Sequence, residues 1–231
     1  MQTAPTSRPV KLGLPPPAPL IGYLANELGF LYAYLGDITF NRLTRDYMRS
    51  YPDLPIDPAA VKKNLLKYIG GQTLVQRNPE ILELADLELA LNFALNAPDE
   101  KLLSVQEFDN LPSAKRETVV FNVVSSYQLL LFKQNTTSIW SAMKCEERPP
   151  KPHLLDEPQN LLVWRQRDAP RFRLLGRDEA CLFALISKKM SLRRASVRMN
   201  ADAANTEELL NYLRGWVEAE LILFRFDELS K

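Results

Sequence analysis

Residues 204–229 decide the fold that we predict for this chain, and they end on the stretch Leu221-Ile222-Leu223-Phe224-Arg225-Phe226. The segment begins with the leucine spacing of an amphipathic helix and ends with the residue types of a β-strand. A terminal strand must pair with an earlier one, and residues 161–165 and 172–175 are the obvious partners. We therefore expect a three-stranded C-terminal sheet with one edge left open.

The rest of this C-terminal unit follows from local signals. Residues 161–165 and 171–175 flank the turn Asp168-Ala169-Pro170, which predicts a β-hairpin. Helical patterns follow at residues 178–190, at residues 191–195 and at residues 205–220. The order strand, strand, three helices, strand is that of a winged helix-turn-helix variant. We therefore predict a winged-helix-like domain over residues 154–231.

The first half of the chain has helical patterns. Leucine and aromatic spacing predicts helices over residues 20–35, 38–50, 59–69 and 78–96, with Gly36 ending the first and Pro98 the last. Residues 118–124 are β-rich, residues 127–132 form a strand or a short buried segment, and residues 137–144 are helical. We expect a Pro-rich arm over residues 1–19, a mainly helical partner-binding domain over residues 20–148, and a linker over residues 146–158. The fold class is α+β.

Composition limits what the chain does. The 29 Lys and Arg residues nearly balance 28 Asp and Glu, so overall charge gives no case for nucleic acid. No apolar run reaches the roughly 18 residues of a membrane span, and residues 1–19 lack a signal-peptide layout. We expect a cytoplasmic protein without a membrane partner. Its two cysteines are too few for a disulfide framework, and Cys181 is expected to be buried on an apolar helix face.

The residues that usually carry catalysis are missing. The only histidine, His153, lies between prolines in the predicted linker, and the chain has no phosphate-binding glycine loop, metal-ligand pair or nucleophile motif. Glu83 and Asp86 are expected to form part of a solvated acidic helix face. We therefore predict no catalytic residue and no metal site, and a binding module in place of an enzyme.

A winged-helix unit binds either DNA or an extended peptide. DNA is favoured by the basic residues of the first two helices, Lys188, Lys189, Arg193, Arg194 and Arg198. The third helix opposes it, because its charged residues are mostly acidic: Glu207, Glu208, Glu218 and Glu220 against Arg214. Nucleic acid is thus the second hypothesis.

Peptide binding is favoured by the terminal strand. Both of its faces are rich in apolar groups, and an open apolar edge needs a cover. The alternative is an ordinary edge strand without a ligand. The predicted contact residues belong to the strand, the helix before it and the basic hairpin: Leu221, Ile222, Leu223, Phe224, Arg225, Phe226, Tyr212, Trp216, Arg171 and Arg173.

Four segments resemble a known family. Residues 30–40, Phe-Leu-Tyr-Ala-Tyr-Leu-Gly-Asp-Ile-Thr-Phe, with Tyr51-Pro52 after them, are similar to the opening of the HvfC-like proteins. Residues 83–90, residues 139–142 and residues 162–165, followed by residues 175–179, resemble later parts of that family in the same order. The match covers residues 20–229, and a Pro-rich arm replaces the further helix with which typical members begin. This departure favours the shorter, MbnC-type branch over the more distant TglI.

The resemblance implies a function. Proteins of this family are accessory subunits of TIM-barrel-like iron oxidases of the MbnB type, which modify cysteines of a ribosomally made precursor peptide. In methanobactin, a copper chelator, the product is an oxazolone with an adjacent thioamide. The C-terminal unit would then bind the leader region of the precursor peptide, and the helical part would contact the oxidase. Iron would be held by the partner, with no cofactor in this chain.

Overall fold

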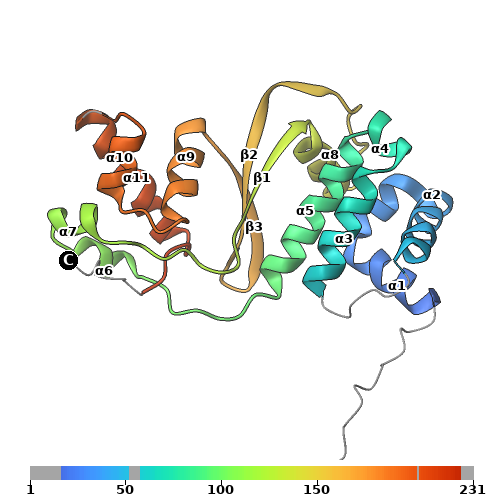
Figure 1. Cartoon of the computed structure of the whole chain (residues 1–231), viewed down its shortest axis with the longest axis horizontal. Helices are drawn as coiled ribbons and strands as arrows, with labels where there is room; N and C mark the ends of the chain where they lie inside the picture. The colour runs from blue at the N-terminus through green and yellow to red at the C-terminus, as the bar shows by residue number, and fades with distance from the viewer. Residues whose placement is uncertain (1–16, 52–57, 202, 225–231) are drawn as a thin grey trace, which may run out of the picture. The chain divides into compact units, whose positions relative to one another are not determined.

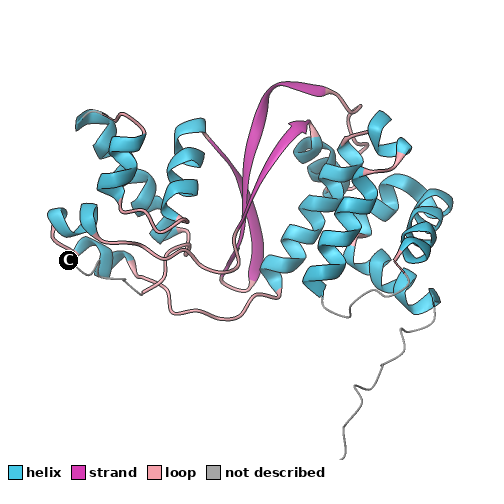
Figure 2. Cartoon of the chain, in the orientation of Figure 1, coloured by secondary structure: helices cyan, strands magenta, loops and turns pink. Residues whose placement is uncertain are grey.

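The computed structural model describes residues 17–51, 58–201 and 203–224, and it is a mixed α+β protein (Figures 1 and 2). The chain forms two compact units, Met1–Asn78 and Pro79–Lys231. The α+β class is therefore confirmed. No helix in the described ranges is long and apolar enough to cross a membrane.

The first unit is helical. It contains α1 (Pro17–Glu27), α2 (Gly29–Ser50), α3 (Pro58–Gly70) and α4 (Thr73–Arg77). Gly36 interrupts α2 with φ 72° and ψ 164°, a conformation that favours glycine, so the predicted helix end at this residue is a kink. The predicted helix over residues 20–35 is also divided at Leu28, whose backbone is not helical. The buried apolar side chains of this unit include Leu31, Phe40, Tyr47, Leu65 and Ile69.

The second unit is built on a three-stranded antiparallel sheet. Its strands are β1 (Gln128–Gln134), β2 (Leu154–Gln166) and β3 (Ala169–Leu175), in the order β1-β2-β3. The predicted hairpin is confirmed, and residues 127–132 adopt the strand alternative. The prediction that the terminal strand completes this sheet is wrong, because β1 pairs with β2 in its place. The short, apolar β1 pairs with the free side of β2, the position predicted for the terminal strand.

The proline-rich segment before β2 differs from the linker that we predicted. β2 begins at Leu154, inside residues 146–158, and pairs with β1 across that segment. The compact units divide after Asn78, not at the segment with linker composition. The prolines and charged side chains of residues 146–158 disfavour a helix, but they are compatible with an exposed, extended strand.

The sheet lies between two groups of helices (Figure 1). α5 (Glu80–Leu95) contacts all three strands on one face, where α8 (Thr136–Lys144) places Trp140 against Phe172 at 5.3 Å between ring centroids. The other face carries Leu162 and Trp164, which pack into the main core with α9 (Arg177–Ile186), α10 (Leu192–Arg198) and α11 (Ala203–Glu218). Two short helices, α6 (Val105–Asp109) and α7 (Ser113–Thr118), pack against α11 and α10.

Two sequence expectations about single side chains fail in this unit. Glu83, expected to be solvated, accepts hydrogen bonds from the backbone of Lys133 (2.7 Å) and Gln134 (3.2 Å) and from the Thr136 hydroxyl (2.5 Å). Burial raises the pKa of Glu83, although these hydrogen bonds oppose the shift. Cys181, expected to be buried, is exposed, because the apolar face of α9 that packs into the core carries Leu182, Phe183 and Ile186.

Candidate functional site

The terminal segment does not provide an open edge. Residues 221–224 lie between two extended stretches, residues 101–103 and 122–124, and hydrogen bond to both. Leu223 donates to the Asn122 carbonyl at 2.8 Å, and Ile222 accepts from the Leu103 N–H at 2.9 Å on the opposite side. The prediction of an open edge along residues 221–224 is therefore wrong. Arg225 and Phe226 lie outside the described residues.

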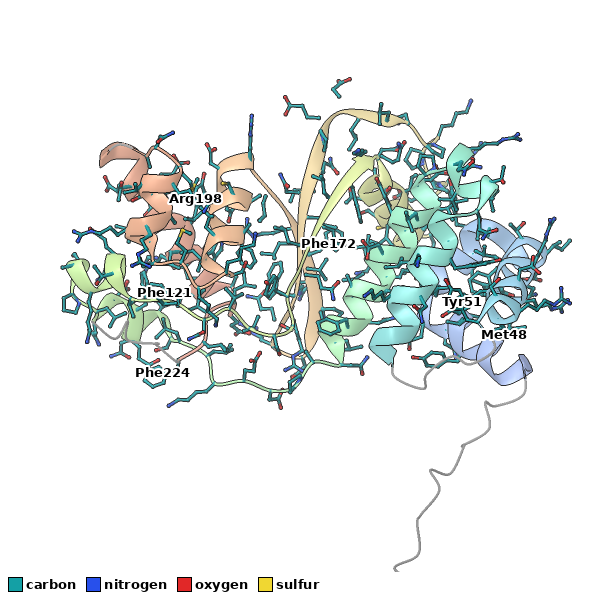
Figure 3. All side chains as sticks on the ribbon, viewed as in Figure 1. Met48, Tyr51, Phe121, Phe172, Arg198 and Phe224 are labelled. Carbon is teal, nitrogen blue, oxygen red and sulfur yellow. The ribbon has the colours of Figure 1, made fainter. Side chains whose placement is uncertain are left out.

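The partners of this segment are too short to be detected as strands. Residues 101–103 and 122–124 form isolated bridges, at Leu102 and Val123. Leu221 and Ile222 are fully buried in the core, and the Lys101 ammonium lies 4.0 Å from the centre of the Phe224 ring. The segment therefore closes the core of the second unit. Phe224 and Phe172, the latter on β3, lie in different parts of that unit (Figure 3).

The open edges belong to the sheet, and the hairpin fixes which backbone groups of β3 face away from β2. Gln166 and Ala169 pair across a two-residue loop in which Arg167 has φ 55°. The pair that closes such a loop exchanges both backbone hydrogen bonds, and hydrogen-bonded and non-hydrogen-bonded pairs then alternate. Counted from this pair, Pro170, Phe172 and Leu174 direct their backbone groups away from β2.

Two observations support this assignment. Pro170 has no N–H to donate, and it falls at an outward position where none is needed. By the same alternation Arg165 directs its N–H toward the β1 side, where it donates to the Ser126 hydroxyl at 3.4 Å. Within the described ranges, no hydrogen bond joins the outward groups of Phe172 or Leu174 to another segment. β3 thus presents an open edge.

The other edge of the sheet is partly covered. By the same alternation, the outward N–H groups of β1 belong to Leu129, Leu131 and Lys133. The Glu83 carboxylate of α5 accepts the Lys133 N–H and also that of Gln134. This end of β1 is therefore capped from within the unit. Leu131 remains outward on β1, with 57% of its surface exposed.

The side chains of β3 differ on its two faces. Phe172 and Leu174 lie on the α5 face, and Leu174 is 47% exposed. Arg171 and Arg173 lie on the opposite face, beside Trp164 and Leu162. Among the described residues no ion pair involves Arg171, which is exposed. An apolar face and a basic face therefore border one free backbone edge.

Glu179 organises the basic face, and the sequence analysis missed it. Arg173 donates to both carboxylate oxygens of Glu179, and the Trp216 indole N–H donates to one of them at 2.8 Å. Glu179 is buried, and Trp216 is fully buried. An acidic residue in the first turn of a helix usually interacts with the helix dipole, so its position gave no signal of this role.

Tyr212 of α11 is partly buried against the core of the second unit. Its hydroxyl donates to Glu208 at 2.5 Å, and this bond raises the pKa of Tyr212 to about 12, with further contributions from Glu179 and Asp178. The structure places two of the predicted contact residues, Arg171 and Arg173, on one face of β3. It buries Trp216, Leu221 and Ile222, and it places Leu223 and Phe224 beside residues 101–103.

Two of the five basic residues of the DNA hypothesis have partners within the chain. Arg193 pairs with Glu117 at 3.8 Å, and the Lys189 ammonium hydrogen bonds to Asn122. On α11, Arg214 is bound to Asp109 at 3.3 Å and to Glu218 at 2.5 Å. Arg194 and Arg198 are exposed on α10, a helix of seven residues. Arg198 is labelled in Figure 3. The third helix therefore offers no free cation among its described residues.

Comparisons with known proteins give no assignment. No family model matches the chain. A search of the curated proteins also gives no match. In the described parts of the chain, no group of three or more His, Cys, Asp or Glu side chains could hold a metal ion. The resemblance to the HvfC-like proteins therefore rests on the sequence segments quoted above.

Proposed function

We propose that the chain is a non-catalytic, peptide-recognising subunit, and that β3 is the edge on which the peptide binds. The open backbone groups of Phe172 and Leu174 carry this proposal. An extended peptide can add to such an edge as a further strand, with its backbone supplying affinity and its alternate side chains supplying specificity. The site thus shifts from the terminal segment to β3, and Arg171 and Arg173 remain in it.

The ligand and the partner follow from the family resemblance. The peptide would be the leader region of a ribosomally made precursor, and the partner an MbnB-type iron oxidase that converts cysteine to an oxazolone with a thioamide, as in methanobactin biosynthesis. Iron and the reacting groups belong to that partner in this proposal. The present chain would hold the precursor so that its cysteine reaches the oxidase.

The proposal is tested with a proline at each open edge. Leu174→Pro removes an N–H that has no partner within the sheet, so the fold should persist while a bound strand loses a hydrogen bond. Leu131→Pro makes the same change at the outward position of β1 and is the matched control. We expect precursor peptide to bind at least about tenfold more weakly to the first variant and unchanged to the second, by isothermal titration calorimetry.

Both variants must first unfold within about 4 °C of the parent chain, which corresponds to a cost of about 1 kcal/mol. The reverse result, with loss only in Leu131→Pro, would place the peptide on β1. Co-expression with the candidate oxidase should also give a stable 1:1 complex on size-exclusion chromatography. Separate elution, together with no binding of the precursor peptide to the parent chain, would contradict the proposed function.

A further inference from the structure

The two faces that border the β3 edge restrict which peptide fits it. Phe172 and Leu174 alternate with Arg171 and Arg173 along the strand, so apolar and cationic side chains lie on opposite faces. Phe172 packs against Trp140 of α8 in an edge-to-face contact. The exposed half of Leu174 continues this apolar strip toward the end of β3.

The two arginines are not equivalent. Arg173 is engaged at two points by Glu179, which is itself fixed by Trp216. Its charge is thereby compensated within the protein. Arg171 is exposed and has no ion-pair partner in the described part of the chain. A ligand carboxylate therefore gains more binding free energy from an ion pair with Arg171 than from one with Arg173.

The pairing geometry of an added strand determines which peptide residue lies opposite each residue of β3. Directly opposite residues of an antiparallel pair share a face, so the peptide residues opposite Leu174 and Phe172 lie over the apolar strip. The peptide runs opposite to β3 and therefore meets Leu174, Arg173, Phe172 and Arg171 in this order. The three existing strands are antiparallel, and antiparallel pairing is slightly the more stable per residue.

We infer that the β3 edge selects an extended segment with the order apolar, any residue, apolar, acidic, with the acidic side chain placed beside Arg171. This inference rests on the proposed function, because it assumes that a peptide strand adds to β3. Arg171 is then a specificity-determining residue. Arg173 and Glu179 position the strand and do not select charge.

The test uses synthetic nine-residue peptides whose central four residues are Leu-Thr-Val-Asp, flanked by Ser, Thr and Gly. Three variants replace the Asp with Lys, reverse the central order, or move the Asp to the position opposite Arg173. Binding to the full chain is followed by NMR chemical-shift titration. We expect each variant to bind about fivefold more weakly than the parent peptide, with the largest loss for Lys.

A charge exchange identifies the partner residue. Arg171→Glu should reverse the preference, so that the peptide with Lys binds better than the peptide with Asp. Arg194→Glu makes the same change on exposed α10 and should leave the preference unaltered. Suppose that all four peptides bind with equal affinity and that Leu174→Pro still removes their binding. This result would contradict the residue order but would support the proposed function. If no peptide shifts the resonances of β3 and the precursor does not bind either, the proposed function fails with it.

Discussion

Arg173 on β3 and Glu179 on α9 form a two-point ion pair at the margin of the core. The Glu179 side chain is 8% exposed and that of Arg173 is 38% exposed, so the carboxylate depends on the guanidinium and on the Trp216 N–H for its hydrogen bonds. The pair joins the open strand to the helical layer. The pair therefore contributes to holding β3 against the helical layer.

Removing the charge of Glu179 should be costly. Glu179→Gln leaves Arg173 without its counter-ion, and we expect the free energy of unfolding to fall by about 2 kcal/mol in urea titrations. Glu207→Gln, on the exposed face of α11, should change it by less than about 0.5 kcal/mol. Equal effects of the two substitutions would show that the ion pair does not stabilise the unit.

The partly buried carboxylate of Glu83 makes stability depend on pH. Its pKa is raised above the ordinary value of 4.5 by burial, so the folded chain retains this proton at pH values where the unfolded chain has lost it. Stability due to this group is therefore highest below that value and falls as pH rises through the folded pKa.

The change can be isolated with Glu83→Gln, which has no charge to titrate. Between about pH 4 and about pH 7, the parent chain should lose stability relative to the variant, measured as the difference in their urea midpoints. A constant difference, or one that changes in favour of the parent chain as pH rises, would be incompatible with a raised pKa.

The terminal segment should be structural. Leu223→Pro removes the hydrogen bond to the Asn122 carbonyl inside the core, and we expect a loss of about 3 kcal/mol in the free energy of unfolding. Leu174→Pro, at the open edge, should cost less than about 1 kcal/mol. A similar thermal midpoint for both variants would mean that the terminal segment is not closed on both sides.

Arg165 should tie the end of α5 to the sheet. Its guanidinium donates to the carbonyls of Ala97 (2.6 Å) and Pro98 (3.0 Å) and to Asp99 (2.7 Å). Arg165→Lys cannot reproduce this planar set of donors, and we expect a loss of about 1–2 kcal/mol in urea unfolding. Arg171→Lys, at an exposed arginine without an ion pair among the described residues, is the matched control and should be neutral. A neutral Arg165→Lys would contradict the role given to these three bonds.

Local signals explain why much of the fold could be predicted. Pro79 and Asn96 flank α5 close to the expected ends, Gly36 breaks the helical backbone, and the turn around Asp168 forms a hairpin. Each of these depends on caps, turns or side-chain periodicity within a few residues. The candidate site was predicted only in part, because Arg171 and Arg173 follow from their position on a strand, whereas the role of Glu179 does not.

By itself, the sequence determined the longer helices, the β2–β3 hairpin and the basic face of β3, since these depend on neighbouring residues. It did not indicate the short helices α4, α6 and α7. Only the tertiary structure decided that β1 completes the sheet and that residues 221–224 are closed between residues 101–103 and 122–124. It also decided that Glu179 is buried and that Glu83 is partly buried beneath its hydrogen-bond donors on β1 and α8. Strand pairing and the burial of a carboxylate depend on groups far apart in the chain. Extended segments of three residues, such as 101–103 and 122–124, are too short to show the alternating pattern from which a strand is predicted. Because β1 pairs with the other side of β2 and the terminal segment pairs elsewhere, β3 is left as an edge of the sheet.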